Sequence, residues 1–286
     1  MRIGLLASGN LGFIVLEYMK SLYQIEFVMT DKKSNTIIDF CQNNNISYFL
    51  GNPRDRRAHS FYENKLIDLI VSVNYLFLVE KDIIELPTLL AFNIHGSLLP
   101  KYRGRTPHVW SIINNEKYTG ITAHKIDEGC DTGDIIEQIR IEITDTDTGA
   151  SILNKYAKQY IPLIESVIFK LKNDSVVYFK QNENEATYFG VRTPDDGKID
   201  WNWQKERIYN WVRAQASPYP GAFSFYQNVK IIIDEVSFSN YGFNEQMPNG
   251  LILSEKPLLV KTSNGVIELT VVRNGNIKFK VGLKLI

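Results

Sequence analysis

Three polar residues in the middle of the chain, Asn93, His95 and Asp131, have the types and spacing of an acid–base site. Asn93 and His95 lie two positions apart after an apolar run, so they share one face if this segment is a strand. Asp131 follows in a loop bracketed by glycines, EGCDTG, which can bring a carboxylate back to the imidazole. An amide, an imidazole and a carboxylate that meet at a strand end can orient a neutral amine, accept its proton and stabilise an oxyanion.

The elements that must position these residues alternate between strand and helix patterns. This rhythm predicts an α/β fold with a doubly wound, mostly parallel, Rossmann-like sheet. Ligands bind such sheets beyond the carboxyl ends of the strands, where we expect Asn74, Tyr75, Asn93 and His95. The predicted strands cover 2–7, 25–30, 46–49, 69–73, 90–95, 120–125 and 135–143, and the helices 12–22, 36–43, 60–66, 81–86, a segment from 107 and one from about 148 to 172.

The last third of the chain changes character. We expect a catalytic domain over 1–180, a polar linker over 181–205 and a smaller β-rich domain over 206–286. Short strand-like segments separated by turns dominate the last part, including IKFKVGL at 277–283. Their frequency predicts a small β-barrel related to the oligonucleotide-binding fold.

Composition excludes several classes of protein. Lys and Arg number 32, as do Asp and Glu, so the formal charge is zero and argues against a nucleic-acid or anionic-membrane partner. Two cysteines, Cys41 and Cys130, make no disulfide framework, which favours a reducing cytoplasm. No apolar run is long enough to span a membrane. We expect no bound metal, since the acidic residues near Asp131 lie in one loop without His-rich spacing.

A lone Asn or His at a strand end is also typical of a turn, so the surrounding motifs decide the interpretation. N-x-H is followed by S-L-L-P-K-Y-R-G at 97–104 and by D-T-G at 131–133. In this combination the chain resembles the formyltransferases that use 10-formyltetrahydrofolate. The resemblance implies that Asn93, His95 and Asp131 are catalytic and that 10-formyltetrahydrofolate is the co-substrate.

A second motif favours one branch of this family. R-T-P-D-D at 192–196, R-A at 213–214 and P-Y-P-G-A-F at 218–223 resemble the enzymes that act on nucleotide-linked amino sugars, especially UDP-4-amino-4-deoxy-L-arabinose. The resemblance implies formylation of a UDP- or dTDP-linked amino sugar for surface polysaccharides such as lipopolysaccharide, by a homodimer. Methionyl-tRNA formyltransferase is the alternative. A non-catalytic folate or sugar-nucleotide binding protein is the second alternative, since fold does not fix function.

Further candidate residues surround the expected site. Guanidinium groups match phosphate oxygens and aromatic rings stack on bases, which suggests the substrate-binding side chains. The folate residues rest on loop position alone, because the family contacts the pterin mainly through backbone groups. We expect folate contacts from Asn74, Tyr75, Leu86, Leu90, Gly129 and Gly133, and substrate contacts from Tyr102, Arg103, Arg105, Arg192, Trp201, Arg213 and Tyr219.

Overall fold

A computed structural model describes residues 1–273 and 277–286 of the 286-residue chain. The chain forms two compact units that interleave along the sequence. Unit 1 comprises 1–104, 120–141 and 155–189, and unit 2 comprises 105–119, 142–154 and 190–286. The predicted domain limits at 180 and 205 were placed where the composition of the chain changes. The two units above are defined by contacts in space, so those limits stay a prediction.

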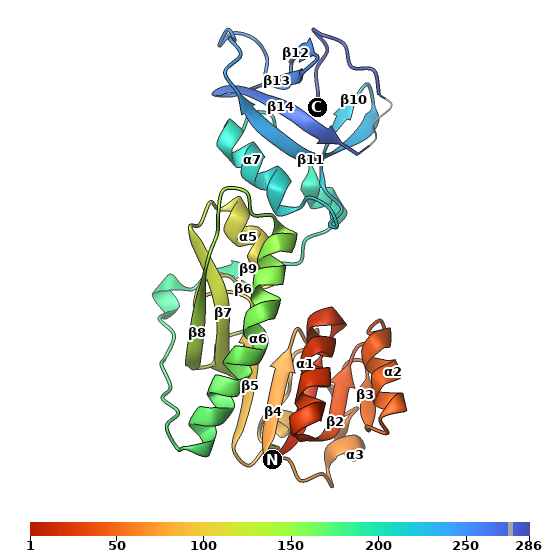
Figure 1. Ribbon diagram of the computed structural model, residues 1–286, viewed down its shortest axis with the longest axis vertical. Helices are drawn as coiled ribbons and strands as arrows, with labels where there is room; N and C mark the ends of the chain where they lie inside the picture. Colours follow the sequence, from red (N-terminus) through yellow and green to blue (C-terminus); the bar gives the residue numbers. More distant parts are fainter. Residues whose placement is uncertain (274–276) are drawn as a thin grey trace. The chain divides into compact units, whose positions relative to one another are not determined.

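Unit 1 is built on a sheet of seven strands in the order β3-β2-β1-β4-β5-β7-β8 (Figure 1). The five strands from β3 to β5 pair in parallel, and β7 then pairs antiparallel with β5. The strands are β1 (Arg2–Ala7), β2 (Gln24–Thr30), β3 (Tyr48–Leu50), β4 (Leu69–Val73), β5 (Leu90–His95), β7 (Tyr118–Lys125) and β8 (Ile135–Glu142).

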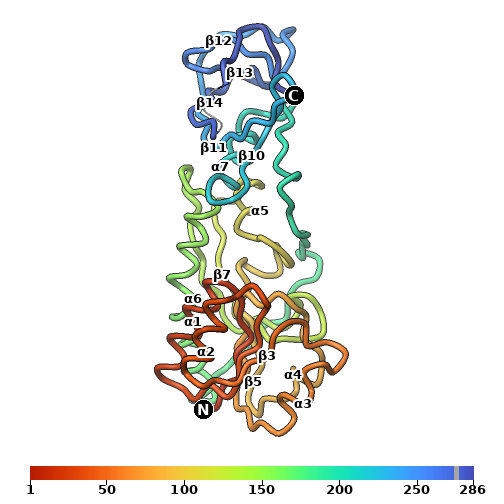
Figure 2. The backbone as a smooth tube through the Cα atoms, turned by 90° about the vertical axis from the view of Figure 1, so that its right-hand side faces the viewer, coloured from red at the N-terminus to blue at the C-terminus, as the bar shows by residue number. Residues whose placement is uncertain are grey.

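Helices cover both faces of this sheet. Figure 2 shows α1, α2 and α6 on one side and α3 and α4 on the other. Parallel strands covered on both faces need apolar residues throughout, as in β4, LIVSV, where all five residues are buried. The helices of the chain are α1 (Gly9–Leu22), α2 (Asn35–Asn43), α3 (His59–Tyr62), α4 (Lys81–Ile84), α5 (Pro107–Ile113), α6 (Gly149–Lys172) and α7 (Lys205–Ala214), with 3₁₀ turns at Glu183–Glu185 and Pro194–Gly197.

Unit 2 contains a separate antiparallel sheet in the order β10-β11-β14-β13-β12. Its strands are β10 (Ala222–Tyr226), β11 (Val229–Ser239), β12 (Ile252–Glu255), β13 (Leu258–Thr262) and β14 (Gly265–Val272). The mostly parallel sheet and the β-rich C-terminal part confirm the predicted fold class. Among the residues that the structure describes, no helix is long and apolar enough to cross a bilayer.

One predicted strand is wrong. Residues 277–283 alternate apolar and basic side chains, yet no strand forms there, and only isolated bridges follow at Lys284 and Leu285. Gly282 has a φ of 84°, and its N–H donates to Ile252. A left-handed glycine turns the chain at 281–282. Residues 277–280 before this turn pair with no described strand, so their alternation does not mark a sheet segment.

A short two-stranded sheet completes unit 1. β6 (Arg103–Gly104) pairs in parallel with β9 (Tyr188–Phe189). Gly104 has a φ of 95°, and a Cβ there would lie 2.4 Å from the Phe189 carbonyl oxygen. The glycine of the R-G motif therefore allows the backbones of β6 and β9 to approach each other closely.

Candidate active site

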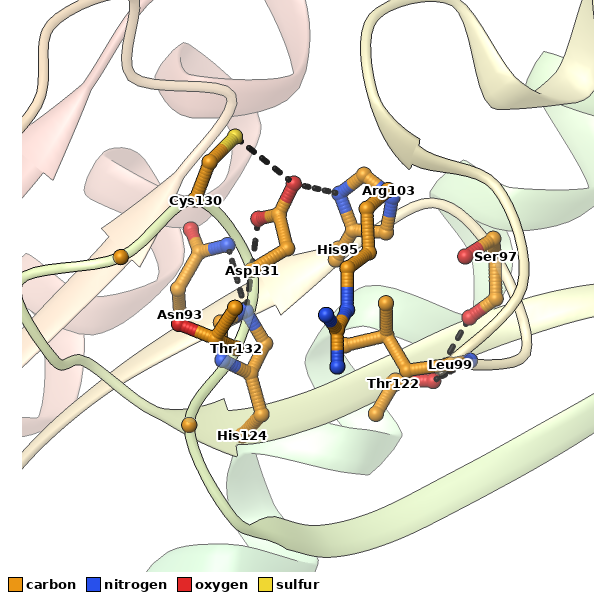
Figure 3. A network of polar contacts seen from close by, with 12 residues as sticks. Asn93, His95, Ser97, Leu99, Arg103, Thr122, His124, Cys130, Asp131 and Thr132 are labelled. Atoms are coloured by element: carbon orange, nitrogen blue, oxygen red, sulfur yellow. Dashed lines mark hydrogen bonds and ion pairs between the residues drawn. The ribbon is translucent and has the colours of Figure 1, made fainter. Parts of the chain in front are cut away.

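Strand β5 places Asn93 and His95 on one face of the sheet, at its carboxyl end. Antiparallel pairing with β7 sets Asn93 opposite His124 and His95 opposite Thr122. Directly opposed residues lie close enough for their side chains to meet. The Asn93 amide Nδ2 lies 3.1 Å from His124 Nε2 (Figure 3).

A backbone carbonyl decides which nitrogen of the buried His95 ring carries the hydrogen. Its Nε2 donates to the carbonyl oxygen of Tyr102 at 2.8 Å, because a carbonyl can only accept. Its Nδ1 lies 3.4 Å from Asp131 Oδ2. Burial lowers the pKa of His95 below its ordinary value, although the nearby Asp131 carboxylate opposes that shift. The ring is therefore neutral at pH 7 and keeps a lone pair on Nδ1.

The carboxylate of Asp131 lies between two imidazoles (Figure 3). Its Oδ2 accepts from the Gly104 N–H at 2.9 Å, and its Oδ1 lies 3.6 Å from His124 Nε2. Burial alone would raise the pKa of Asp131, but a proton on either facing imidazole, His95 or His124, together with the Gly104 N–H, outweighs burial and lowers it. Asp131 is thus ionised, beside a ring that can take up a proton.

The structure brings together the three residues that were singled out for chemistry. Asn93, His95 and Asp131 converge although 38 positions separate the first from the last. Their catalytic roles stay predictions at this point. The arrangement combines a neutral base, an anion that stabilises its protonated form, and an amide donor, and this set is suited to acyl transfer.

His124 is a member of this cluster that sequence reasoning missed. Its Nδ1 donates to the Lys125 carbonyl at 2.8 Å, which leaves Nε2 as an acceptor for the Asn93 amide. The side chain is buried. The sequence did contain a hint, because Thr122 and His124 alternate in a predicted strand and so share one face. That hint places His124 in the site only if one knows that this strand pairs with β5.

The loop after β5 is anchored to the neighbouring strands by a small polar network. Thr122 Oγ1 donates to the Ser97 carbonyl at 2.6 Å and accepts from the Leu99 N–H at 3.2 Å. Gln138 Nε2 donates to the Leu99 carbonyl at 2.9 Å. These bonds hold the loop that carries the Tyr102 carbonyl, and hence the hydrogen bond to His95.

The predicted folate residues near β4 and β5 do not all lie at the end of the sheet that holds this cluster. Asn74 and Tyr75 directly follow β4, next to β5, and the Tyr75 hydroxyl is buried without a hydrogen-bond partner among the described residues. Leu90 is buried at the opposite end of β5, five residues or roughly 16 Å of strand before His95. The structure thus places Leu90 away from the cluster, and its expected folate contact stays a prediction. Leu86 packs against an apolar cluster that includes Ala91 and Ile83.

Gly129 and Gly133 shape the loop that presents Asp131. A Cβ on Gly129 would lie 2.0 Å from Thr132 Oγ1, and one on Gly133 would lie 1.9 Å from the Lys125 carbonyl oxygen. Side chains at either position would force the loop open. The two glycines are needed for this turn, and their predicted folate contacts stay a prediction.

Among the predicted substrate residues in unit 1, Arg103 has an internal role. Its side chain is 0% exposed and makes five hydrogen bonds, to Gln181, Glu183 and Tyr188. A guanidinium has five N–H groups, so none remains for a diphosphate. We correct the assignment of Arg103 as a phosphate ligand on this ground. Tyr102 is also buried, and its ring stacks on Phe189 at 5.0 Å between centroids.

Two predicted arginines in unit 2 are likewise held by their own unit. Arg192 lies over the rings of Trp110 and Trp211 at 4.8 and 4.6 Å, and donates to Gln215. Arg213 is buried, and its guanidinium donates to the carbonyls of residues 144 and 147 and to the side chain of residue 210. Both sets of contacts favour a structural role over the predicted phosphate contact.

The remaining predicted substrate residues differ in exposure. Trp201 is buried, with its indole N–H donating to Ser224, so it packs inside unit 2 and does not present a ring to a base. Tyr219 is half-buried, and its hydroxyl lies 2.9 Å from His108 Nε2. Arg105 is exposed directly after the R-G motif. Within the described ranges, no group of three His, Cys, Asp or Glu side chains is arranged to hold a metal ion.

Several solved structures share this fold. A sugar 3-N-formyl transferase, WlaRD, studied with dTDP and 5-N-formyl-THF, matches at 23% identity and a TM-score of 0.69, over 94% of this chain and 96% of that one. An N-formyltransferase from Helicobacter canadensis in complex with folinic acid and dTDP-3-aminofucose matches at 24% and 0.70, over 94% and 97%. Methionyl-tRNA formyltransferase from Clostridium thermocellum matches at 23% and 0.56, over 84% and 94%.

Two family models match the chain. Residues 192–280 match the formyl transferase C-terminal domain. Residues 23–168, just over half of the chain, match the formyl transferase family and include Asn93, His95, His124 and Asp131. The chain therefore belongs to the formyl transferase family.

Proposed function

We propose that this protein transfers the formyl group of 10-formyltetrahydrofolate to the primary amine of a nucleotide-linked amino sugar. The observation that carries this proposal is the neutral His95 ring, whose Nδ1 lone pair lies 3.4 Å from an ionised Asp131. An amine attacks a carbonyl only when its nitrogen lone pair is available, so a neutral base beside it is the essential group.

The reaction follows from the atoms of this cluster. The amine nitrogen attacks the formyl carbon, and His95 Nδ1 takes the proton that the nitrogen loses. The imidazolium then faces the Asp131 carboxylate, which stabilises its charge. When the bond from the formyl carbon to N10 breaks, the same proton passes to N10. The products are the N-formyl sugar and tetrahydrofolate, and no covalent enzyme intermediate forms.

Asn93 is the proposed donor to the oxyanion of the tetrahedral intermediate. Its Nδ2 carries two hydrogens, and one of them is donated to His124 Nε2. The second remains for the oxygen of the formyl group. Because His124 Nε2 is an acceptor, it selects the orientation of the amide in which nitrogen, and not oxygen, faces it.

The nature of the acceptor rests on likeness and on charge. The two sugar N-formyltransferase structures match with TM-scores of 0.69 and 0.70, against 0.56 for the methionyl-tRNA enzyme. Residues 206–286 contain nine Lys or Arg and six Asp or Glu, a net charge of 9 − 6 = +3. A domain that grips the tRNA backbone is usually more basic. Both observations favour a sugar nucleotide, and dTDP is the nucleotide of the two similar enzymes.

Arg105 is the proposed ligand of the diphosphate, because it is the exposed one of the four predicted arginines. We further propose that the protein is a cytoplasmic homodimer that serves surface-polysaccharide synthesis. Light scattering of the purified chain tests the dimer, because a single species near 32.9 kDa would contradict it.

A panel assay tests the proposed function. Purified protein is given 10-formyltetrahydrofolate with dTDP- and UDP-linked 3-amino and 4-amino sugars, methionyl-tRNA or glycinamide ribonucleotide, and the release of tetrahydrofolate is followed. We expect turnover with one or more amino sugars, together with an N-formyl product of 28 additional mass units, about the mass of CO, since a formyl replaces a hydrogen. Turnover with methionyl-tRNA alone would overturn the sugar assignment, and binding without turnover would favour a folate or sugar-nucleotide sensor.

A further inference from the structure

A segment that follows α6 runs across both loops of the active site. We define the strap as residues 179–189, all of which lie in unit 1. It begins with a bridge in which the N–H groups and carbonyls of Phe179 and Ile135 bond reciprocally at 2.8 and 2.9 Å. It ends with the pairing of β9 and β6. The predicted linker over 181–205 overlaps the strap, and the structure places residues 181–189 in unit 1.

Gln181 connects the two loops through a single side chain. Its Nε2 donates to the carbonyl of Asp131 at 2.9 Å and to that of Gly133 at 2.7 Å. Its Oε1 accepts from Arg103 Nε at 3.1 Å and from Nη2 at 2.8 Å. Both donors and the acceptor of this amide are therefore used. Gln181 fixes the backbone of the Asp131 loop relative to the loop that carries Arg103.

Arg103 in turn ties the strap down. Its Nη1 and Nη2 donate to the two carboxylate oxygens of Glu183 at 2.9 and 2.7 Å, a paired geometry that fixes direction as well as distance. Its guanidinium carbon lies 5.2 Å from the centre of the Tyr188 ring. Because Arg103 is fully buried, loss of one partner would leave donors without a bond, so this arrangement is rigid.

The far end of the strap sets the carbonyl that His95 uses. Thr187 accepts from the Tyr102 N–H through its Oγ1 at 2.8 Å and from the Arg103 N–H through its carbonyl at 2.8 Å. These bonds hold the peptide units around Tyr102, whose carbonyl oxygen accepts from His95 Nε2. One strap thus positions the partners of both ring nitrogens of His95.

We propose that Gln181 is a positioning residue for formyl transfer, which acts by holding Asp131 at its distance from His95 while Arg103 and the strap hold Tyr102. This inference rests on the proposed function, because it assumes that the His95–Asp131 pair performs the chemistry. A misplacement of about 1 Å at a reacting group can cost on the order of a hundredfold in rate, so the anchoring of Asp131 has a measurable consequence.

The test is the variant Gln181→Leu, which keeps the size of the side chain but removes its donors and acceptor. We expect kcat to fall by about 10- to 100-fold, with the KM for folate and for the sugar nucleotide changed by less than about threefold. Asn184→Leu is the matched control, since it makes the same amide-to-leucine change on an exposed residue of the same strap. We expect this control to keep the wild-type kcat.

A double variant separates positioning from a general structural role. If Gln181 acts through Asp131, Gln181→Leu should have little further effect on kcat in an Asp131→Asn background. Equal losses in both backgrounds would contradict the proposal, as would a wild-type kcat in Gln181→Leu. Thermal unfolding and folate binding of each variant show how much of the protein is folded. A kcat per folded molecule of Gln181→Leu equal to that of wild type would also overturn the positioning proposal.

Failure of this inference is distinguishable from failure of the proposed function. If the wild-type protein formylates none of the amino sugars, the proposed function fails before any variant is made. In that case the ¹⁵N resonances of His95 still test the positioning role, because displacement of Asp131 changes the environment of Nδ1. Unchanged His95 resonances in Gln181→Leu would contradict the positioning role, whatever the substrate is.

Discussion

Two buried polar clusters, one in each unit, use their hydrogen-bonding capacity differently. In unit 2, Arg213 donates to the carbonyl oxygens of residues 144 and 147 and to the side-chain oxygen of Asn210, so each of these contacts joins a donor to an acceptor. In unit 1, a neutral His95 turns a lone pair on Nδ1 toward the Asp131 carboxylate, so two acceptors face each other. Once Nδ1 is protonated, it becomes a donor that faces the Asp131 carboxylate, and the mismatch between two acceptors is removed.

The difference shows how to tell a structural cluster from a reactive one. Buried polar groups are normally satisfied, because an unmade hydrogen bond costs free energy. A cluster with every bond made resists change and stabilises the fold. A cluster that lacks one proton is set up to accept it, and in the proposed formyl transfer the attacking amine supplies that proton.

The largest effect should come from removing the proton acceptor. His95→Gln keeps an N–H that can reach the Tyr102 carbonyl but has no titratable lone pair. We expect formylation to fall by about 10²- to 10⁴-fold, the usual contribution of a general base. Steady-state kinetics with the amino-sugar substrate measure this loss. Retention of wild-type turnover by folded His95→Gln would refute the assignment of the base.

The next effect concerns the oxyanion. Asn93→Ala removes the amide donor, and the loss of one such donor costs on the order of 10²- to 10³-fold in kcat. The binding of folate and sugar nucleotide should survive, because the contact is made mainly in the transition state. Isothermal titration and kinetics on the same sample separate these effects. A rise in KM with an unchanged kcat would assign Asn93 to ground-state binding instead.

A half-buried histidine in unit 2, His108, offers a contrast in stability. Burial lowers the pKa of His108 to about 4, so the unfolded chain binds a proton at higher pH than the folded one. The unfolding free energy should therefore fall as pH decreases from about 6.5 toward about 4, by roughly 2 kcal/mol between pH 7.5 and 5. Urea unfolding of wild type and His108→Gln at both pH values measures this term. Equal pH dependence in the two proteins would exclude His108 as its source.

The smallest effect should come from the residue that orients Asn93. His124→Phe removes the acceptor for the Asn93 amide, and we expect kcat to fall about 10- to 100-fold as the amide loses its fixed direction. His124→Gln keeps an oxygen that can accept the same bond, so part of the activity should return. If both variants lose kcat equally, a role of His124 in orienting Asn93 is not supported.

Sequence was informative wherever a local rule decides the structure. Strand periodicity put Asn93 and His95 on one face, and the alternation of strands and helices predicted the parallel sheet. His124 and Gln181 depend on pairings between distant segments: β5 with β7, and the strap with the Asp131 loop. No local pattern encodes those pairings, so both residues were missed.

Residue type also misled where burial decides the role. Arg103 has the chemistry to bind phosphate, yet all of its N–H groups are used inside unit 1. Leu90 was assigned to the site although it lies at the other end of the same strand. At 277–283 an alternating pattern gave a false strand, because residues 277–280 pair with no described strand and the chain turns at Gly282.

The measurement that tests the central claim most directly is a pH profile of kcat/KM beside a ¹⁵N titration of His95 in the same buffers. Burial lowers the pKa of His95 below the ordinary value of about 6.5, so the neutral base is lost only as pH falls through that lower value. We predict that the acid limb of the rate coincides with the His95 titration and that both lie below pH 6.5. A rate limb that does not follow His95, or a His95 that titrates above that value, would contradict the account.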